Sequence, residues 1–117
     1  RDLHSFPTRR SSDLENFPVT GYTLKEVIGE LSVDFLHIDI QGSEFEIIES
    51  AIQIINSQVR AMLIGTHSRV IEGKLIEFLY KHGWYLHREK PCRFNLVEKP
   101  VTIEAMTVVD GIQYWRR

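Results

Sequence analysis

The apolar residues of this sequence alternate between continuous runs and helical stripes. Residues 33–40 read VDFLHIDI, and their nearly continuous apolar run is typical of a strand covered on both faces, as in a parallel sheet. The polar turn Gln41-Gly42-Ser43 follows, and residues 44–55 then show a wide apolar stripe with helical spacing. The stretch predicts a buried strand, a turn and a helix, around which the other predicted elements are organised.

Two short polar patterns mark the starts of helices. Thr23 and Glu26 have capping-box spacing, in which the threonine hydroxyl binds the helix start and the glutamate reaches back. Apolar residues at helical spacing then predict a short helix that extends to Leu31. Ser43 and Glu46 repeat the capping-box spacing at the start of the next predicted helix.

The second half of the chain predicts three more strands and one more helix. The predicted elements are a strand over 59–64, a helix over 70–82 ended by Gly83 in a left-handed conformation, a strand over 84–88, a loop over 91–100, a strand over 102–109, and a tight turn at Asp110-Gly111 that returns through 112–115.

Strands that alternate with helices indicate an α/β fold with a mostly parallel sheet and right-handed crossovers. The last strand follows a long loop and no helix. Because a parallel return needs a crossover connection, we expect this last strand to be antiparallel to its neighbour.

Residues 1–14 do not share the patterning of the rest of the chain. The string RDLHSFPTRRSSDL has no apolar periodicity, and it resembles translated sequencing-adapter sequence. We interpret it as a non-native segment that replaces the true N-terminal part, the alternative being a genuine disordered tail. We therefore expect a single partial domain over residues 15–117.

Composition excludes several classes of function. A formal net charge of −2 gives no electrostatic reason to expect nucleic acid or an anionic membrane as partner. No apolar run approaches the roughly 20 residues of a membrane span. The single cysteine, Cys92, excludes an internal disulfide framework and a cysteine-based zinc site, and we expect a reducing cytoplasm. The oligomeric state stays open.

Polar residues that follow the first two predicted strands form the candidate site. Ligands of open α/β sheets bind beyond the carboxyl ends of the strands, which is where Asp39 and Gln41 stand. Thr66 and His67 follow the next strand and should share that crevice, where a histidine can act as general base. Asp39 could instead only cap the following helix, and Glu44 could only complement the dipole of its first turn.

Several motifs of known chemistry are missing from the sequence. We find no Gly-x-Gly-x-x-Gly loop for phosphates, no His-x-x-x-His spacing for a metal, and no Gly-x-Ser-x-Gly context for a nucleophile. We assign no metal ligands and leave metal dependence open.

The strand–turn–helix stretch resembles a known family. Residues 36–44, LHIDIQGSE, are similar to the "KIDVEGAE" signature of FkbM-type methyltransferases. Thr23-Leu24 before it, residues 62–68 and 83–86 after it, and the tail 110–116 follow in family order. The resemblance covers about residues 19–117.

The resemblance implies a class I, Rossmann-like O-methyltransferase that uses S-adenosylmethionine and methylates hydroxyls of sugars or other small-molecule natural products. This chain would supply the fourth to seventh strands, as the C-terminal part of the enzyme. The glycine-rich loop and the acidic ribose-binding residue would precede it, so we expect the chain alone to be inactive and its sheet to have an uncovered edge. The implied roles are catalysis by Asp39 and His67, cofactor contacts by Asp39, Gln41 and Gly42, and substrate contacts by Thr66 and Glu44.

Two departures from the family pattern and two other functions need to be weighed. Gln41 and Gly65 stand where the family commonly has glutamate, which weakens any acid, base or metal role assigned there. A non-catalytic interaction fragment is one alternative. A phosphoreceiver domain with Asp39 as acceptor, supported by Thr66 and Lys90, is the other.

Overall fold

The computed structural model describes residues 21–117, so the segment 1–14 lies outside the described residues. The helices are α1 (Leu24–Ile28), α2 (Glu44–Ser50), α3 (Ile52–Gln58), α4 (Arg69–Lys81) and the short 3-10 helix η1 (Glu104–Met106). The strands are β1 (Leu36–Ile38), β2 (Ala61–Thr66), β3 (Tyr85–Lys90), β4 (Arg93–Phe94), β5 (Thr107–Val109) and β6 (Gly111–Arg116).

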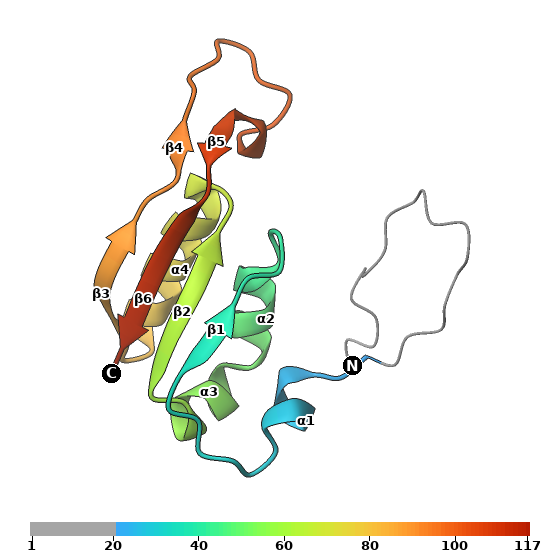
Figure 1. Ribbon diagram of the computed structural model, residues 1–117, viewed down its shortest axis with the longest axis vertical. Helices are drawn as coiled ribbons and strands as arrows, with labels where there is room; N and C mark the ends of the chain where they lie inside the picture. The colour runs from blue at the N-terminus through green and yellow to red at the C-terminus, as the bar shows by residue number, and fades with distance from the viewer. Residues whose placement is uncertain (1–20) are drawn as a thin grey trace.

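Four strands form the main sheet, in the order β1-β2-β6-β3 (Figure 1). β1 is parallel to β2, and β6 is antiparallel to both of its neighbours, so β1, β2 and β3 all run in one direction. This confirms the predicted α/β class. The antiparallel strand of the main sheet is β6, whereas the sequence predicted an antiparallel last strand over 102–109. β1 lies at the edge of the sheet, as expected.

The main core lies between the sheet and the helices α2, α3 and α4, which cover one face (Figure 1). Along β6, Gln113 and Trp115 are fully buried, whereas Ile112 and Arg116 are exposed. This period-two alternation shows that β6 packs on the helices with one face only. None of the helices in residues 21–117 has the length and apolar character needed to cross a bilayer.

The opposite face of the sheet carries a row of aromatic rings. The ring centroids of Phe35 and Tyr114 are 6.3 Å apart, those of Tyr114 and His87 5.5 Å, and those of His87 and Tyr85 5.9 Å. Phe35 is 52% exposed, so the expectation of a first strand covered on both faces is wrong. His37 in β1 is exposed as well, because β1 is an edge strand with helices on one side only.

The starts and ends of the helices follow local hydrogen bonds. The Thr23 capping box is present, since Glu26 N–H donates to Thr23 Oγ1 at 3.0 Å and Thr23 N–H donates to Glu26 Oε1 at 2.8 Å. The helix stops at Ile28 rather than Leu31 because Gly29 takes a φ of +55°.

The helix predicted over residues 44–55 is two helices with a break at Ala51. Beside the break, the Ser50 hydroxyl donates to Ile47 O at 2.9 Å, a local bond that competes with regular helix geometry. Ser43 makes no side-chain capping bond, so the second predicted capping box is wrong. The Glu44 carboxylate instead accepts hydrogen bonds from the backbone N–H groups of Ile40 and Gly42 in this turn.

The predicted hairpin at Asp110-Gly111 does not form. β5 pairs with β4, and β6 pairs with β2 and β3, so Asp110 joins two different sheets. A two-residue hairpin of the favoured type needs positive φ at both central residues, and Gly111 has no positive φ. Residues 91–110, which we call the arm, project beyond the main sheet (Figure 1) and contain the short strand pair β4 and β5. β4 lies where the sequence predicted a loop, and β5 is the end of the strand predicted over 102–109, of which residues 104–106 form η1 instead.

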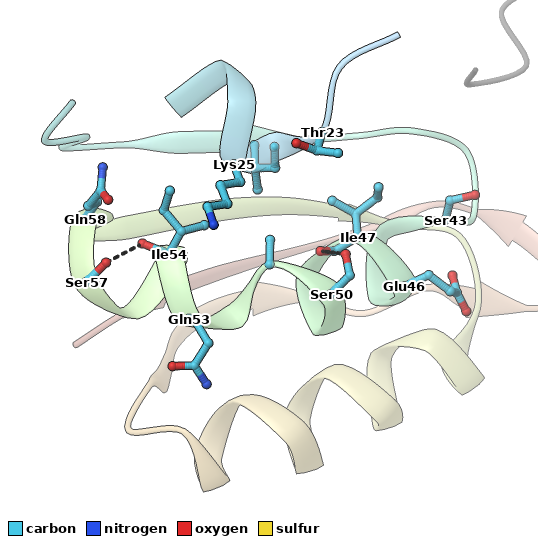
Figure 2. A pocket seen from close by; sticks show the side chains of 12 residues that line it. Thr23, Lys25, Ser43, Glu46, Ile47, Ser50, Gln53, Ile54, Ser57 and Gln58 are labelled. Atoms are coloured by element: carbon cyan, nitrogen blue, oxygen red, sulfur yellow. Dashed lines mark hydrogen bonds between the residues drawn. The ribbon is translucent and has the colours of Figure 1, made fainter. Parts of the chain in front are cut away.

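A cavity of about 1040 Å³ lies between α1 and the helices α2 and α3 (Figure 2). Its lining includes Thr23, Lys25, Glu46, Ile47 and Gln58 and contains neither Asp39 nor His67. The cavity is therefore separate from the candidate site.

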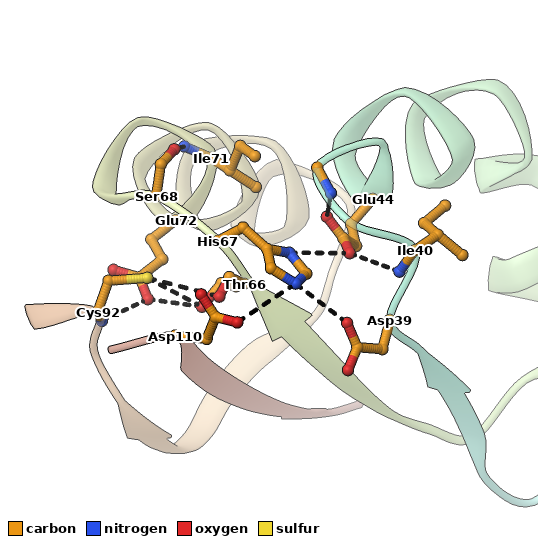
Figure 3. A network of polar contacts seen from close by, with 11 residues as sticks. Asp39, Ile40, Glu44, Thr66, His67, Ser68, Ile71, Glu72, Cys92 and Asp110 are labelled. Carbon is orange, nitrogen blue, oxygen red and sulfur yellow. Dashed lines mark hydrogen bonds and ion pairs between the residues drawn. The ribbon is translucent and has the colours of Figure 1, made fainter. Parts of the chain in front are cut away.

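A buried polar cluster fastens the arm to the main sheet (Figure 3). Glu72, in α4, is 5% exposed, and its Oε2 accepts hydrogen bonds from Thr66 Oγ1 at 2.6 Å and from Cys92 N–H at 2.9 Å. A Cβ on Gly111 would lie 2.6 Å from Thr66 Oγ1 and 2.7 Å from Cys92 N. The cluster thus satisfies a buried carboxylate and has no room for a side chain at the start of β6.

Gly83→Ala should destabilise the protein. Gly83 has a φ of +88°, and the N–H groups of Gly83 and Trp84 donate to Tyr80 O and Leu79 O at the end of α4. An alanine methyl is strained in this left-handed conformation, so the free energy of unfolding should fall by about 1–2 kcal/mol in urea titrations. Gly73→Ala is the matched control, because its added Cβ meets nothing within 4 Å and alanine favours helix by about 0.5–1 kcal/mol. Equal effects of the two variants would show that the left-handed conformation of Gly83 carries no energetic cost for alanine.

Cys92 should react slowly and should make stability depend on pH. Burial raises the pKa of the Cys92 thiol, and the neighbouring Glu72 carboxylate also raises it. Alkylation of the native chain by iodoacetamide should be at least about tenfold slower than in denaturant. Because the folded pKa is the higher one, the thiol's contribution to stability is complete below the unfolded pKa of about 8.5 and is lost as pH rises through the folded value. In urea titrations, the free energy of unfolding of Cys92→Ala should therefore fall less at alkaline pH than that of the wild type. Identical pH profiles of the two proteins would refute this contribution of the thiol.

Candidate functional site

Asp39 and His67 meet at the carboxyl end of the sheet (Figure 3). Each residue follows one of two adjacent parallel strands, and the pairing of Ile38 with Ile64 brings the ends of β1 and β2 side by side. Asp39 Oδ1 lies 3.2 Å from His67 Nε2. The structure therefore places these two residues together, as the sequence indicated, while a shared ligand crevice and their chemical roles remain predictions.

Glu44 is fully buried beneath this pair. Its Oε2 accepts a hydrogen bond from Ile40 N–H at 2.7 Å, and its Oε1 accepts one from Gly42 N–H at 3.1 Å. The same Oε2 lies 3.3 Å from His67 Nδ1. A side chain with no exposed surface is badly placed for the predicted substrate contact, and the structure makes Glu44 part of the support of the site.

Asp110 is a site residue that sequence reasoning missed. Its Oδ2 lies 3.7 Å from His67 Nε2, and its side chain is 63% exposed. Gly111 pairs with Thr66 across the antiparallel ladder, so the residue before Gly111 must lie close to the residue after Thr66. The pairing register of β6 with β2 therefore determines the position of Asp110. The sequence analysis missed this residue because it assigned Asp110 to a hairpin turn.

Three carboxylates therefore surround one imidazole. Asp39 and Asp110 approach Nε2, and Glu44 approaches Nδ1. Within residues 21–117, no lysine or arginine forms an ion pair with any of these three acids. The cluster carries excess negative charge, which a protonated imidazole or another cation would offset.

Asp39, Glu44 and His67 also form a set that could hold a metal ion, since one ligand atom from each lies within 4.8 Å of the others. The sequence assigned no such set. In the present geometry the two carboxylates approach opposite nitrogens of the ring. One ion cannot lie in both contacts at once, so the arrangement is that of an imidazole held by carboxylates at its two nitrogens.

The turn after β1 is open to solvent. Gln41 is exposed and has a φ of +60°, and Gly42 has a φ of +103° with nothing within 4 Å of an added Cβ. Asp39 itself is 47% exposed. A ligand could therefore approach the backbone here closely, as the predicted cofactor contacts of Asp39, Gln41 and Gly42 require.

Thr66 does not have the position that a substrate contact requires, and Gly65 has a steric role beside Asp39. Thr66 is fully buried and its hydroxyl is bound to Glu72, so the predicted substrate contact of Thr66 does not fit the structure. A Cβ on Gly65 would lie 2.8–3.0 Å from the carboxyl group of Asp39. The absence of a side chain at Gly65 thus leaves the space that the Asp39 carboxylate occupies.

Comparisons with known proteins identify the family. The model of the methyltransferase FkbM domain matches residues 2–89. A putative methyltransferase of Jannaschia sp. (strain CCS1) is 39% identical over 97 residues, which is 81% of this chain and 33% of that protein. No solved structure matches the chain significantly. The chain spans about a third of the length of this relative, and by both matches it belongs to the FkbM methyltransferase family.

Proposed function

We propose that the complete protein is an S-adenosylmethionine-dependent O-methyltransferase that acts on a hydroxyl of a sugar or another small molecule. The family supports methyl transfer, and the proposal adds the cofactor, the oxygen acceptor and its chemical class. The observation that carries it is the convergence of Asp39 and His67 at the ends of two parallel strands. The antiparallel β6 supports a class I, Rossmann-like sheet, to which these strands would contribute the fourth to the seventh.

The turn from Asp39 to Gly42 fits the cofactor. Its exposed carboxylate and amide side chains can hydrogen-bond to a polar ligand, and the missing side chain at Gly42 permits close approach of the backbone. S-adenosylmethionine, when bound, supplies an electrophilic methyl group on a positively charged sulfur. The acidic surroundings of this turn favour such a cation.

His67 and the two exposed carboxylates fit the acceptor. The acceptor hydroxyl would lie beside His67 Nε2, between Asp39 and Asp110. During transfer of the methyl group to the hydroxyl oxygen, His67 would accept the hydroxyl proton on Nε2. Asp39 and Asp110, which lie 3.2 Å and 3.7 Å from Nε2, stabilise the imidazolium that results.

The other two functions are less favoured. A phosphoreceiver domain would need an available hydroxyl at Thr66, but this hydroxyl is buried and bound to Glu72. The family match covers most of the chain and also opposes a purely non-catalytic interaction role.

The first test is calorimetric titration of S-adenosylhomocysteine into the full-length gene product that contains residues 21–117. We expect micromolar binding by the wild type and weak binding by the present chain alone.

Asp39→Ala should lower methyl transfer about 10²–10⁴-fold, because it removes the charge that supports the base. Asp34→Ala is the control, since Asp34 is an exposed acid just before β1. A folded full-length protein that does not bind S-adenosylhomocysteine would exclude the proposed function.

A second test moves Asp39 without removing it. Gly65→Ala places a methyl group less than 3.0 Å from the Asp39 carboxyl carbon and so displaces this carboxylate from His67. Since small misplacements in an active site are costly, turnover should fall about 10–100-fold. Thermal unfolding should show a folded protein, and Gly73→Ala should retain full activity. Unchanged turnover in a folded Gly65→Ala enzyme would show that the Asp39–His67 geometry is not needed.

A further inference from the structure

We propose that Glu44 is a positioning residue that holds the proton of His67 on Nδ1 and so leaves Nε2 free to act as the base. The assignment of the ring proton rests on geometry alone. Its consequence for catalysis rests on the proposed function.

The helix dipole does not explain the position of Glu44. Both Glu44 and Glu46 lie in the first turn of α2, where the dipole favours an acid. Glu46 is exposed, whereas Glu44 has no exposed surface. Burial of a carboxylate is unfavourable unless partners replace water, so the reason for the burial of Glu44 must lie in its contacts.

The contacts of Glu44 join two parts of the site. Through Ile40 N–H and Gly42 N–H, the carboxylate fixes the turn that follows Asp39. Through Oε2, which accepts from Ile40 N–H, it also lies 3.3 Å from His67 Nδ1. One oxygen atom of Glu44 therefore fixes the position of the backbone next to Asp39 with respect to the imidazole ring of His67.

The proton on the ring follows from this arrangement. Nδ1 is shielded from solvent and has no hydrogen bond of standard geometry within residues 21–117, and Glu44 Oε2 lies next to it. An ionised carboxylate only accepts hydrogen bonds, so Nδ1 can be satisfied here only as a donor. A neutral ring with its proton on Nδ1 has its lone pair on Nε2.

The charged groups that face His67 come from three elements. Asp39 from the end of β1 and Asp110 from the residue before β6 face Nε2, and Glu44 from α2 faces Nδ1. Because Asp39 and Asp110 also prefer a proton donor, they would favour the opposite tautomer in a neutral ring. The buried Glu44 is the contact that opposes them, and its replacement should let the proton move to Nε2.

The test is long-range ¹H–¹⁵N correlation NMR of the chain labelled with ¹⁵N-histidine, at a pH where the rings are neutral. The wild type should show His67 protonated on Nδ1. His82 is an internal reference, since its Nδ1 lies 2.9 Å from Phe78 O, which only accepts. In Glu44→Gln the proton of His67 should move to Nε2 in most molecules, while His82 stays unchanged. Glu46→Gln, on the same helix turn, should leave both rings as they are.

Two results would overturn the proposal: a wild-type His67 protonated on Nε2, or a Glu44→Gln spectrum in which His67 is unchanged. If Glu44→Gln does not fold, which the His82 signal reports, the wild-type spectrum decides alone. In the full-length protein, Glu44→Gln should lower kcat at least about tenfold and change the KM of the acceptor little. If His67 shows the expected tautomer but the full-length protein does not transfer methyl groups, the proposed function is wrong. The role of Glu44 in holding the ring proton is then still supported.

Discussion

The parallel pairing of β1 with β2 is the constraint on which the site depends. Only a strand pair that runs in one direction ends at one edge, and the pairing of Ile38 with Ile64 brings Asp39 and His67 there together. The antiparallel β6 completes the arrangement from the other side, because its first residue, Gly111, pairs with Thr66. The three acids that surround His67 thus come from two distant parts of the sequence, since Asp39 and Glu44 belong to one strand–turn–helix stretch and Asp110 precedes β6. The backbone hydrogen bonds of one sheet bring Asp39 and Asp110 beside His67.

Two buried glutamates make these strand ends rigid. Glu72 binds Thr66 and the backbone of Cys92, and it fixes the base of the arm below the site. Glu44 binds the backbone of the turn after β1 and lies against His67. Glu44 accepts two backbone N–H groups and Glu72 accepts one, so each carboxylate offsets part of its own desolvation cost. Gly65 also keeps Asp39 in position, because a side chain there would occupy the place of the Asp39 carboxylate.

Sequence patterns predicted those parts of the molecule that local interactions determine. The Thr23 capping box, the helix α4 with its left-handed Gly83, and the strand–turn–helix stretch around Asp39 all depend on neighbours in sequence. The errors arose where distant contacts decide. Glu44 and Thr66 looked like ligand contacts because nothing in their local sequence shows that both are fully buried. Asp110-Gly111 has the composition of a hairpin turn, but the space between β2 and β3 determines where the chain goes after Asp110.

The site combines a histidine ring that is held in place with acids that are exposed, and this division suits the proposed methyl transfer. His67 is 15% exposed and is held from below by a carboxylate without exposed surface, so its ring has little freedom. Asp39 and Asp110 are about half or more exposed, and they can turn toward a ligand or toward the imidazolium as the reaction requires. In-line displacement at a methyl carbon depends mainly on alignment, to which a rigid proton acceptor contributes, whereas the change in charge is best met by side chains that can adjust. Asp110 belongs to the arm, so an acceptor that contacts the arm would also shift the carboxylate that, in the proposed reaction, stabilises the protonated His67.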